Sequence, residues 1–147
     1  MEGVLPLRKP AGMTSHDAVD RVRRLIGIRR IGHTGTLDPD ASGVLPLCIG
    51  KAARAAEWLQ ERPKEYEAVM RIGIATDTGD LSGTVKERAD RAELAADQVE
   101  RALQRFRGVI SQVPPMYSAV RVGGKRLHEL ARAGGEVERK PREGTIH

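Results

Sequence analysis

Between two apolar segments the chain reads Gly32-His33-Thr34-Gly35-Thr36-Leu37-Asp38-Pro39-Asp40-Ala41-Ser42-Gly43. Glycine allows positive φ and close approach of the backbone to a ligand, and the Asp38–Pro39 pair favours an extended or turning backbone at the aspartate. A carboxylate held in such a loop can act as a nucleophile or a base. A lone Asp-Pro pair is more typical of a turn or a cap, so the surrounding sequence has to decide between these interpretations.

The segments on either side of this loop predict alternating strands and helices. Residues 3–9 are typical of a short strand, and residues 44–49 of a buried one. Between them Ser15 is expected to cap a helix that runs to about residue 26 and stops at Gly27. Residues 51–60 are expected to be helical. Cys48 lies in the second apolar run, which favours a buried core thiol over a catalytic one. The apolar face of the first helix is predicted to hold Ala18, Val19, Val22, Leu25 and Ile26.

The second half of the chain is expected to continue in the same manner. Apolar and polar residues alternate over 66–74, which predicts a half-buried strand, and residues 76–83 form a polar turn. A helix is predicted over 96–106, an extended segment over 113–121, a short helix over 126–133 and a strand from about residue 138. This irregular alternation indicates an α+β fold with a mixed, mainly antiparallel sheet flanked by helices and loops.

Charge is distributed unevenly along the chain. Residues 1–54 carry nine basic and five acidic side chains, residues 55–100 six and eleven, and residues 101–147 ten and four. Arginine outnumbers lysine 19 to 6, and its planar guanidinium suits phosphate. If the two basic segments share a face, they form a footprint for nucleic acid. The alternative is a solvated, arginine-rich surface.

Several classes of site are excluded by spacing. The glycine-rich loop lacks the Gly-Lys-Ser/Thr ending of a P-loop. The stretch from Asp77 fails as a calcium loop, since its third position is Gly79 and its twelfth is Arg88. Four scattered histidines and one cysteine give no zinc spacing, so neither a metal nor a cofactor is expected. No membrane span or signal peptide is predicted, and the single cysteine fits a reducing cytoplasm.

Six motifs, in a fixed order along the chain, decide between the chemical and the structural interpretation of Asp38. They cover residues 3–15, 32–39, 42–47, 64–66, 76–78 and 114–119, and read GVLPLRKPAGMTS, GHTGTLDP, SGVLPL, KEY, TDT and PPMYSA. Together they closely resemble the TruB family of tRNA pseudouridine synthases, over nearly the whole chain. The resemblance implies the fold of a pseudouridine synthase catalytic domain, action on uridine 55 in the T loop of tRNA, and no cofactor.

The resemblance also implies roles for individual residues. Asp38 matches the catalytic aspartate, His33 a histidine that supports nucleotides displaced from the T loop, and Tyr66 a tyrosine that stacks on the target uracil. Asp77 matches a motif residue near the active-site cleft. The neighbours of Asp38 expected to bind substrate are Gly35, Thr36 and Leu37. The basic side chains expected to contact the RNA backbone are Lys9, Arg29, Arg30, Arg121 and Lys125.

Two of these roles compete with structural alternatives. Tyr66 lies on the apolar face of its predicted strand, so it could pack in the core instead of stacking on a base, a contact worth roughly 1–3 kcal/mol. His33 could serve as a cap within the loop. For Asp38 two mechanisms stay open, attack on C1′ or removal of the 2′ proton, and both need an ionised carboxylate close to the sugar.

The chain departs from the family pattern in two respects. His128 stands where the family usually has an aromatic residue, and Gly144 stands where it favours a β-branched one. Family members continue well beyond residue 147, so residues 1–147 are expected to be the N-terminal portion of the catalytic domain. The arginine that pairs with the aspartate and the C-terminal RNA-binding domain are then absent. The alternative function is a non-catalytic tRNA-binding or RNA-binding module. No obligatory protein partner is evident.

Overall fold

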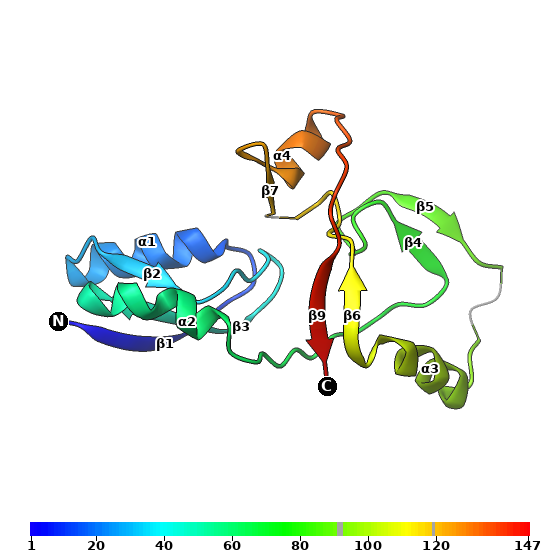
Figure 1. The fold of residues 1–147 in the computed structure, drawn as a ribbon, viewed down its shortest axis with the longest axis horizontal. Coiled ribbons are helices and arrows are strands. Elements are labelled where there is room, and N and C mark those ends of the chain that lie inside the picture. The colour runs from blue at the N-terminus through cyan, green and yellow to red at the C-terminus, as the bar shows by residue number, and fades with distance from the viewer. Residues whose placement is uncertain (91–92, 119) are drawn as a thin grey trace. The chain divides into compact units, whose positions relative to one another are not determined.

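The computed structural model describes residues 1–90, 93–118 and 120–147, without the side chain of His128. Ala119 of the sixth motif and the aromatic-to-histidine difference at position 128 therefore lie outside the described part. The chain divides into two compact units, Met1–Glu67 and Ala68–His147. Each unit is built around its own strand pairings (Figure 1).

The first unit is built on a three-stranded antiparallel sheet in the order β1-β3-β2. The central strand β3 (Gly43–Ile49) pairs along its whole length with β1 (Gly3–Lys9) and over three residues with β2 (Ile31–His33). The strands predicted at 3–9 and 44–49 are confirmed. The short strand β2 was not predicted, because three residues are too few for a periodic pattern to show.

Helix α1 (Ser15–Ile26) is capped one residue earlier than predicted. The Thr14 hydroxyl accepts a hydrogen bond from the Asp17 amide, and the Asp17 carboxylate accepts one from the Thr14 amide. The Thr14 hydroxyl also donates to the Asp17 carboxylate at 2.7 Å, and this bond, with the one from the Thr14 amide, holds the pKa of the Asp17 carboxyl below its ordinary value. Gly27 ends the helix in the left-handed conformation, as predicted, with φ 69°. Ser15 is therefore not needed as a cap.

The core of the first unit lies between α1 and the sheet. Three small side chains of the helix pack onto four apolar side chains of the strands; the cluster is Ala18, Val19, Val22, Ile31, Leu45, Leu47 and Ile49. Leu25 was predicted on this face but is 76% exposed, since the packed stripe ends with Ile26 at the edge of the cluster. Every second residue of β3 from Leu45 to Ile49 thus belongs to the core shared with α1.

The helical prediction for residues 51–60 is confirmed by a 3-10 turn at Gly50–Ala55 followed by α2 (Ala56–Gln60). This segment approaches strand β2 closely, because a Cβ on Gly32 would lie 3.5 Å from the Ala56 Cβ. Cys48, on β3, is fully buried, and burial raises the pKa of its thiol. The prediction of a core thiol is confirmed.

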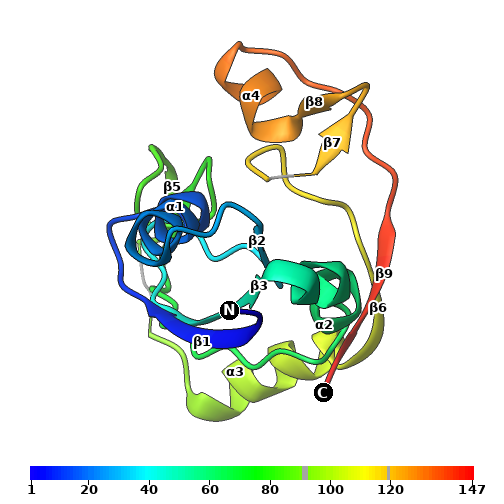
Figure 2. The same ribbon diagram turned by 90° about the vertical axis from the view of Figure 1, so that its left-hand side faces the viewer.

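The second unit contains three two-stranded antiparallel ladders. Strand β4 (Ile74–Thr76) pairs with β5 (Val85–Arg88), β6 (Gly108–Gln112) with β9 (Arg142–Ile146), and β7 (Arg121–Val122) with β8 (Lys125–Arg126). Helix α3 (Ala96–Leu103) with a 3-10 turn at Gln104–Phe106, and helix α4 (Leu127–Arg132), confirm the helices predicted there. Figure 2 shows the β7–β8 hairpin beside α4.

Two strand predictions in this half are wrong in extent. The alternating segment at 66–74 forms no strand before Ile74, and Val69 is 98% exposed. Alternation produces a strand only where a partner backbone is available, and β5 reaches only from Thr76 back to Ile74. The last strand begins at Arg142 and not near 138, because the five residues of β6 set its length. Every strand pairing in the described ranges is antiparallel, which confirms the α+β class.

Candidate active site

The loop that carries Asp38 leaves β2 and returns in β3, so both of its ends are fixed by the sheet. The amide of Thr34, which is buried, donates to the Pro46 carbonyl at 3.2 Å. Leu37 packs against the edge of the core cluster. Asp38 itself is exposed, as are Thr36 and Asp40. The loop therefore anchors the side chain of Leu37 and presents Thr36, Asp38 and Asp40 to solvent.

Immediately before Asp38 the main chain is held by Ser15. The Ser15 hydroxyl donates to the Leu37 carbonyl at 3.0 Å and accepts from the Leu37 amide at 2.9 Å. Ser15 is only 3% exposed. One side chain at the start of α1 thus engages both peptide groups of the residue that precedes the aspartate.

Immediately after Asp38 the main chain is held by Lys9, the last residue of β1, and by Gly12, which follows that strand. The Pro39 carbonyl accepts from the Gly12 amide at 2.9 Å and from the Lys9 ammonium at 3.3 Å. The same ammonium donates to the carbonyls of Pro10 at 3.0 Å and Met13 at 2.7 Å, and Lys9 is fully buried. The expected contact of Lys9 with RNA phosphate is therefore wrong, because its ammonium is buried and bonds three main-chain carbonyls inside the protein.

The Asp38 side chain has no partner among the described residues. The main-chain carbonyl of Asp38 accepts from the Ala41 amide at 3.1 Å, which closes a turn, but no described donor or cation bonds the carboxylate. The backbone is thus fixed on both sides while the carboxylate stays open to solvent. A fixed and unpaired carboxylate is what nucleophilic or general base chemistry on a bound substrate requires.

His33 and Gly35 interact within the same loop. The His33 Nδ1 lies 2.5 Å from the Gly35 carbonyl oxygen, and since a carbonyl only accepts, Nδ1 carries a proton. His33 is half-buried at the end of β2, so its local hydrogen bond fixes the ring and leaves Nε2 for another group. A Cβ at Gly35 would lie 3.5 Å from the Lys64 Cε, which is an ordinary van der Waals contact.

Tyr66 lies in a segment without regular structure and is 68% exposed. Its ring is therefore not part of the core of the first unit, which was the structural alternative for this residue. An exposed aromatic ring is available to stack on a base. In the described residues no hydrogen bond involves its hydroxyl.

Asp77 belongs to the second unit, where it closes the turn between β4 and β5. Its carboxylate accepts from the Thr84 amide at 2.8 Å, and its own amide donates to the Thr84 carbonyl at 3.1 Å. Beside it, hydrogen bonds from Ser82 and Thr78 keep the pKa of the Asp80 carboxyl below its ordinary value. The turn is crowded, since a Cβ on Gly83 would fall 2.6 Å from the Asp77 carboxylate.

The other basic residues expected to contact RNA are on the surface. Arg29 and Arg30 follow α1, and Arg121 and Lys125 lie on the β7–β8 hairpin; all four are exposed. No cluster of metal-ligating side chains occurs in the described residues. No helix in the described ranges is long and apolar enough to span a membrane.

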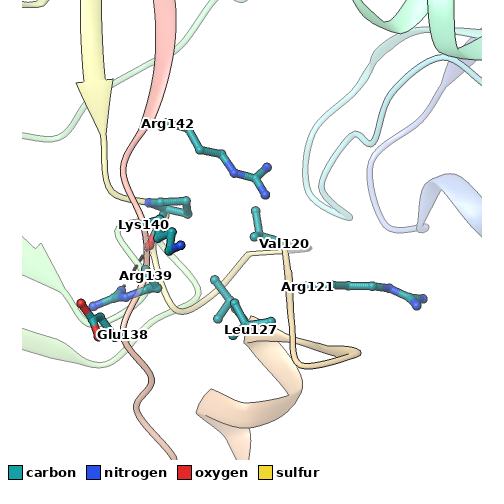
Figure 3. A pocket seen from close by; sticks show the side chains of 9 residues that line it. Val120, Arg121, Leu127, Glu138, Arg139, Lys140 and Arg142 are labelled. Carbon is teal, nitrogen blue, oxygen red and sulfur yellow. Dashed lines mark hydrogen bonds between the residues drawn. The ribbon is translucent and has the colours of Figure 1, made fainter.

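A pocket of about 260 Å³ in the second unit gathers further cations (Figure 3). Its apolar lining includes Leu127, which is fully buried. The Arg139 guanidinium donates to the Pro114 carbonyl at 3.2 Å and pairs with Glu136 at 3.5 Å. The charged residues that line the pocket are Arg121, Glu138, Arg139, Lys140 and Arg142. Sequence reasoning missed the last three cations, although the basic excess of residues 101–147 was the available signal.

Sequence reasoning also missed Ser15 and Gly12 as supports of the Asp38 loop. Both lie in the first of the six motifs, so the motif marked the segment without revealing what it contacts. Serine before a helical pattern is ordinarily explained as a cap. Only the structure shows that Thr14 takes that role and leaves the Ser15 hydroxyl for the loop.

Comparisons with known proteins agree with this arrangement. Residues 23–147 match the family model described as TruB family pseudouridylate synthase (N terminal domain). The tRNA pseudouridine synthase B of Symbiobacterium thermophilum is 56% identical over 147 residues, which cover all of this chain and 49% of that protein. The protein of the same name from Geobacillus kaustophilus is 53% identical over 148 residues, covering all of this chain and 52% of its own length.

A solved structure supports the fold. The crystal structure of a Cbf5-Nop10-Gar1 complex contains a chain that matches with a TM-score of 0.55 and 27% sequence identity, over 81% of this chain and 31% of its own length. This chain spans about half the length of the curated relatives it matches. With a family model that covers residues 23–147, the chain belongs to the TruB family of pseudouridylate synthases, in the part that forms their N-terminal domain.

Proposed function

We propose that this chain carries the catalytic aspartate of a tRNA pseudouridine synthase, which isomerises uridine 55 in the T loop of tRNA. In this proposal residues 1–147 are the N-terminal portion of the catalytic domain, and the substrate places the protein in the cytoplasm. The observation that supports this proposal is the environment of Asp38. Its carboxylate is open to solvent, while Ser15 and Gly12 fix the backbone on either side. The relatives named tRNA pseudouridine synthase B support the choice of substrate.

The chemistry needs little besides a positioned carboxylate. The C1′–N1 bond breaks and N1 gains a proton; after the uracil turns, a C1′–C5 bond forms and C5 releases its proton. Atoms balance without a cofactor or an energy source. Asp38 either attacks C1′, forming an ester bond that breaks when C5 bonds to C1′, or removes the 2′ proton and returns it to C2′ when C5 bonds to C1′. Both roles use the same open carboxylate.

His33 and Tyr66 are proposed to receive the displaced nucleotides. Base flipping costs a few kcal/mol, and stacking on an aromatic ring returns roughly 1–3 kcal/mol per base. The exposed ring of Tyr66 can supply this contact, and the Nε2 of His33 can accept a hydrogen bond from RNA. Gly35, Thr36 and Leu37 are proposed to line the substrate on the side of the loop. For Asp77 the structure favours a role in shaping its own turn.

The assay for this proposal follows from the proton that C5 loses. tRNA carrying 5-tritiated uridine is incubated with the 147-residue chain, and tritium released to water is counted. Release is expected from tRNA with uridine 55 and not from a transcript with cytidine at that position. Binding of tRNA without release by a folded chain would contradict independent catalysis and support the alternative, a non-catalytic RNA-binding module.

Replacement of Tyr66 by leucine is expected to lower kcat/KM for tRNA by about 5- to 150-fold, which corresponds to the loss of one stacked base. Stability should stay unchanged, because the ring is exposed. Trp58→Leu is a matched control, since Trp58 is 79% exposed in the same unit. Equal activity of Tyr66→Leu and the native chain would contradict the stacking role. Tyr66→Phe then separates the ring from the hydroxyl.

The basic pocket of the second unit is proposed to contact the RNA backbone, together with Arg29, Arg30 and Lys125. The double substitution Lys140→Gln/Arg142→Gln is expected to weaken tRNA binding and to reduce the slope of log K against log salt by about 1 to 2. Lys86→Gln/Arg105→Gln removes the same charge from exposed sites outside the pocket. Filter binding at several salt concentrations compares the two. An equal loss in both double variants would show that only net charge matters.

A further inference from the structure

We propose that Ser15 is a positioning residue for Asp38, an inference that rests on the proposed function for its catalytic part. Ser15 lies 23 positions before Asp38 in the chain, at the first residue of α1. Among the described residues its hydroxyl makes no hydrogen bond to the aspartate side chain. It acts through the main chain of Leu37, to which it donates one hydrogen bond and from which it accepts another.

The two bonds fix more than one peptide. The Leu37 amide belongs to the peptide that joins residues 36 and 37, and the Leu37 carbonyl belongs to the peptide that leads into Asp38. One hydroxyl therefore sets the orientation of two consecutive peptide planes. A serine hydroxyl can do this because it has one proton to donate and two lone pairs to accept with.

The opposite side of Asp38 is held independently. The ring of Pro39 restricts φ, and the Pro39 carbonyl is bonded by the Gly12 amide and the Lys9 ammonium. The peptide that directly follows Asp38 is held as well, because the Asp38 carbonyl accepts from the Ala41 amide at 3.1 Å. With the main chain held on both sides, Asp38 moves its carboxylate mainly through its side-chain torsions. Loss of the Ser15 bonds frees the preceding side alone.

Burial makes the hydroxyl difficult to replace by water. Ser15 is 3% exposed and Leu37 packs against the core cluster. In Ser15→Ala the Leu37 amide and carbonyl lose their partner at a site with little access to solvent. The segment is then expected to shift, and displacement of a reacting group by about 1 Å can lower a rate by about 100-fold.

Two readouts test the proposal in Ser15→Ala. The first is amide hydrogen exchange of Leu37, expressed relative to amides of β3, which is expected to accelerate at least about tenfold when its acceptor is removed. The second is tritium release from tRNA, in which kcat is expected to fall about 10- to 100-fold with an unchanged Kd for tRNA. A smaller folded fraction would also lower the apparent kcat, so kcat is expressed per folded molecule.

Val22→Ala is the matched control. Val22 lies on the same helix and is 6% exposed in the core, and no hydrogen bond among the described residues joins it to the Asp38 loop. This variant is expected to lower stability while the relative exchange of Leu37 and kcat stay at native values. An equal loss of kcat in Val22→Ala at matched stability would overturn the proposal, as would unchanged Leu37 exchange or unchanged kcat in an active Ser15→Ala protein.

The exchange measurement also separates this inference from the proposed function. If the native chain releases no tritium, independent catalysis by the chain fails. Leu37 exchange then decides alone whether Ser15 fixes the segment before Asp38.

Discussion

Tritium release is expected to fall by at least about 10²- to 10⁴-fold when Asp38 is replaced by asparagine. This range is what a positioned acid–base group contributes, and a nucleophile that forms a covalent bond would leave even less activity behind. Asparagine has nearly the same shape but neither attacks C1′ nor accepts a proton at neutral pH. Because no described residue bonds the Asp38 carboxylate, the substitution removes no internal interaction. The free energy of unfolding and the Kd for tRNA should therefore stay unchanged.

Asp40→Asn is the control for this experiment. Asp40 is exposed in the same loop, two residues further on, so the variant makes the same chemical change and alters the net charge equally. It should retain native release. If Asp38→Asn releases tritium at the native rate, Asp38 is not the catalytic carboxylate. If both variants lose activity together, the loop is sensitive to charge and the assignment to a single carboxylate fails.

The largest effect on stability is expected at Lys9. Lys9→Met preserves the length and apolar stem of the side chain but removes the ammonium that donates to the carbonyls of Pro10, Met13 and Pro39. The Pro39 carbonyl keeps its bond from the Gly12 amide, but the carbonyls of Pro10 and Met13 lose their bond from the ammonium, at about 1–3 kcal/mol each. This loss is partly offset because a buried charge no longer has to be desolvated. The free energy of unfolding of the first unit should fall by about 2–3 kcal/mol. Urea titration followed by the fluorescence of Trp58 measures this.

The same substitution at an exposed lysine provides the comparison. Lys51 belongs to the first unit, its side chain is 84% exposed, and its ion pair with Glu2 spans 3.9 Å. Lys51→Met should change stability by less than about 0.5 kcal/mol, as surface substitutions usually do. If Lys9→Met is as stable as Lys51→Met, the three carbonyl contacts contribute nothing to the fold. In that event the buried position of Lys9 needs another explanation.

Much of the first unit could be predicted from sequence because its signals are local. The apolar spacing of α1, the left-handed glycine at its end and the continuous apolar run of β3 each depend on neighbouring residues. The segment at 66–74 shows the limit of this reasoning. Its alternation is as clear as that of a true strand, but pairing depends on a distant backbone, which a local pattern does not reveal.

The candidate site divides in the same way. Asp38, His33 and Tyr66 could be selected because the motifs mark them, and their exposure or local hydrogen bonds are compatible with the proposed roles. Lys9 could not be assigned correctly, since a lysine at the end of a strand is ordinarily solvated. Its burial depends on three carbonyls: two follow it closely in the chain, and the third, that of Pro39, lies 30 residues further on. Ser15 was not recognised as a support of the loop, because its position predicts a helix cap, a role that Thr14 performs.

The supports of Asp38 have a consequence for how the protein is made. The hydrogen bonds described above that fix the aspartate loop join residues between 9 and 46. Contacts at such short sequence separation form quickly and need little loop closure. During synthesis domains fold from the N-terminus as they leave the ribosome. The loop can therefore take its final shape while the rest of the polypeptide is still being translated.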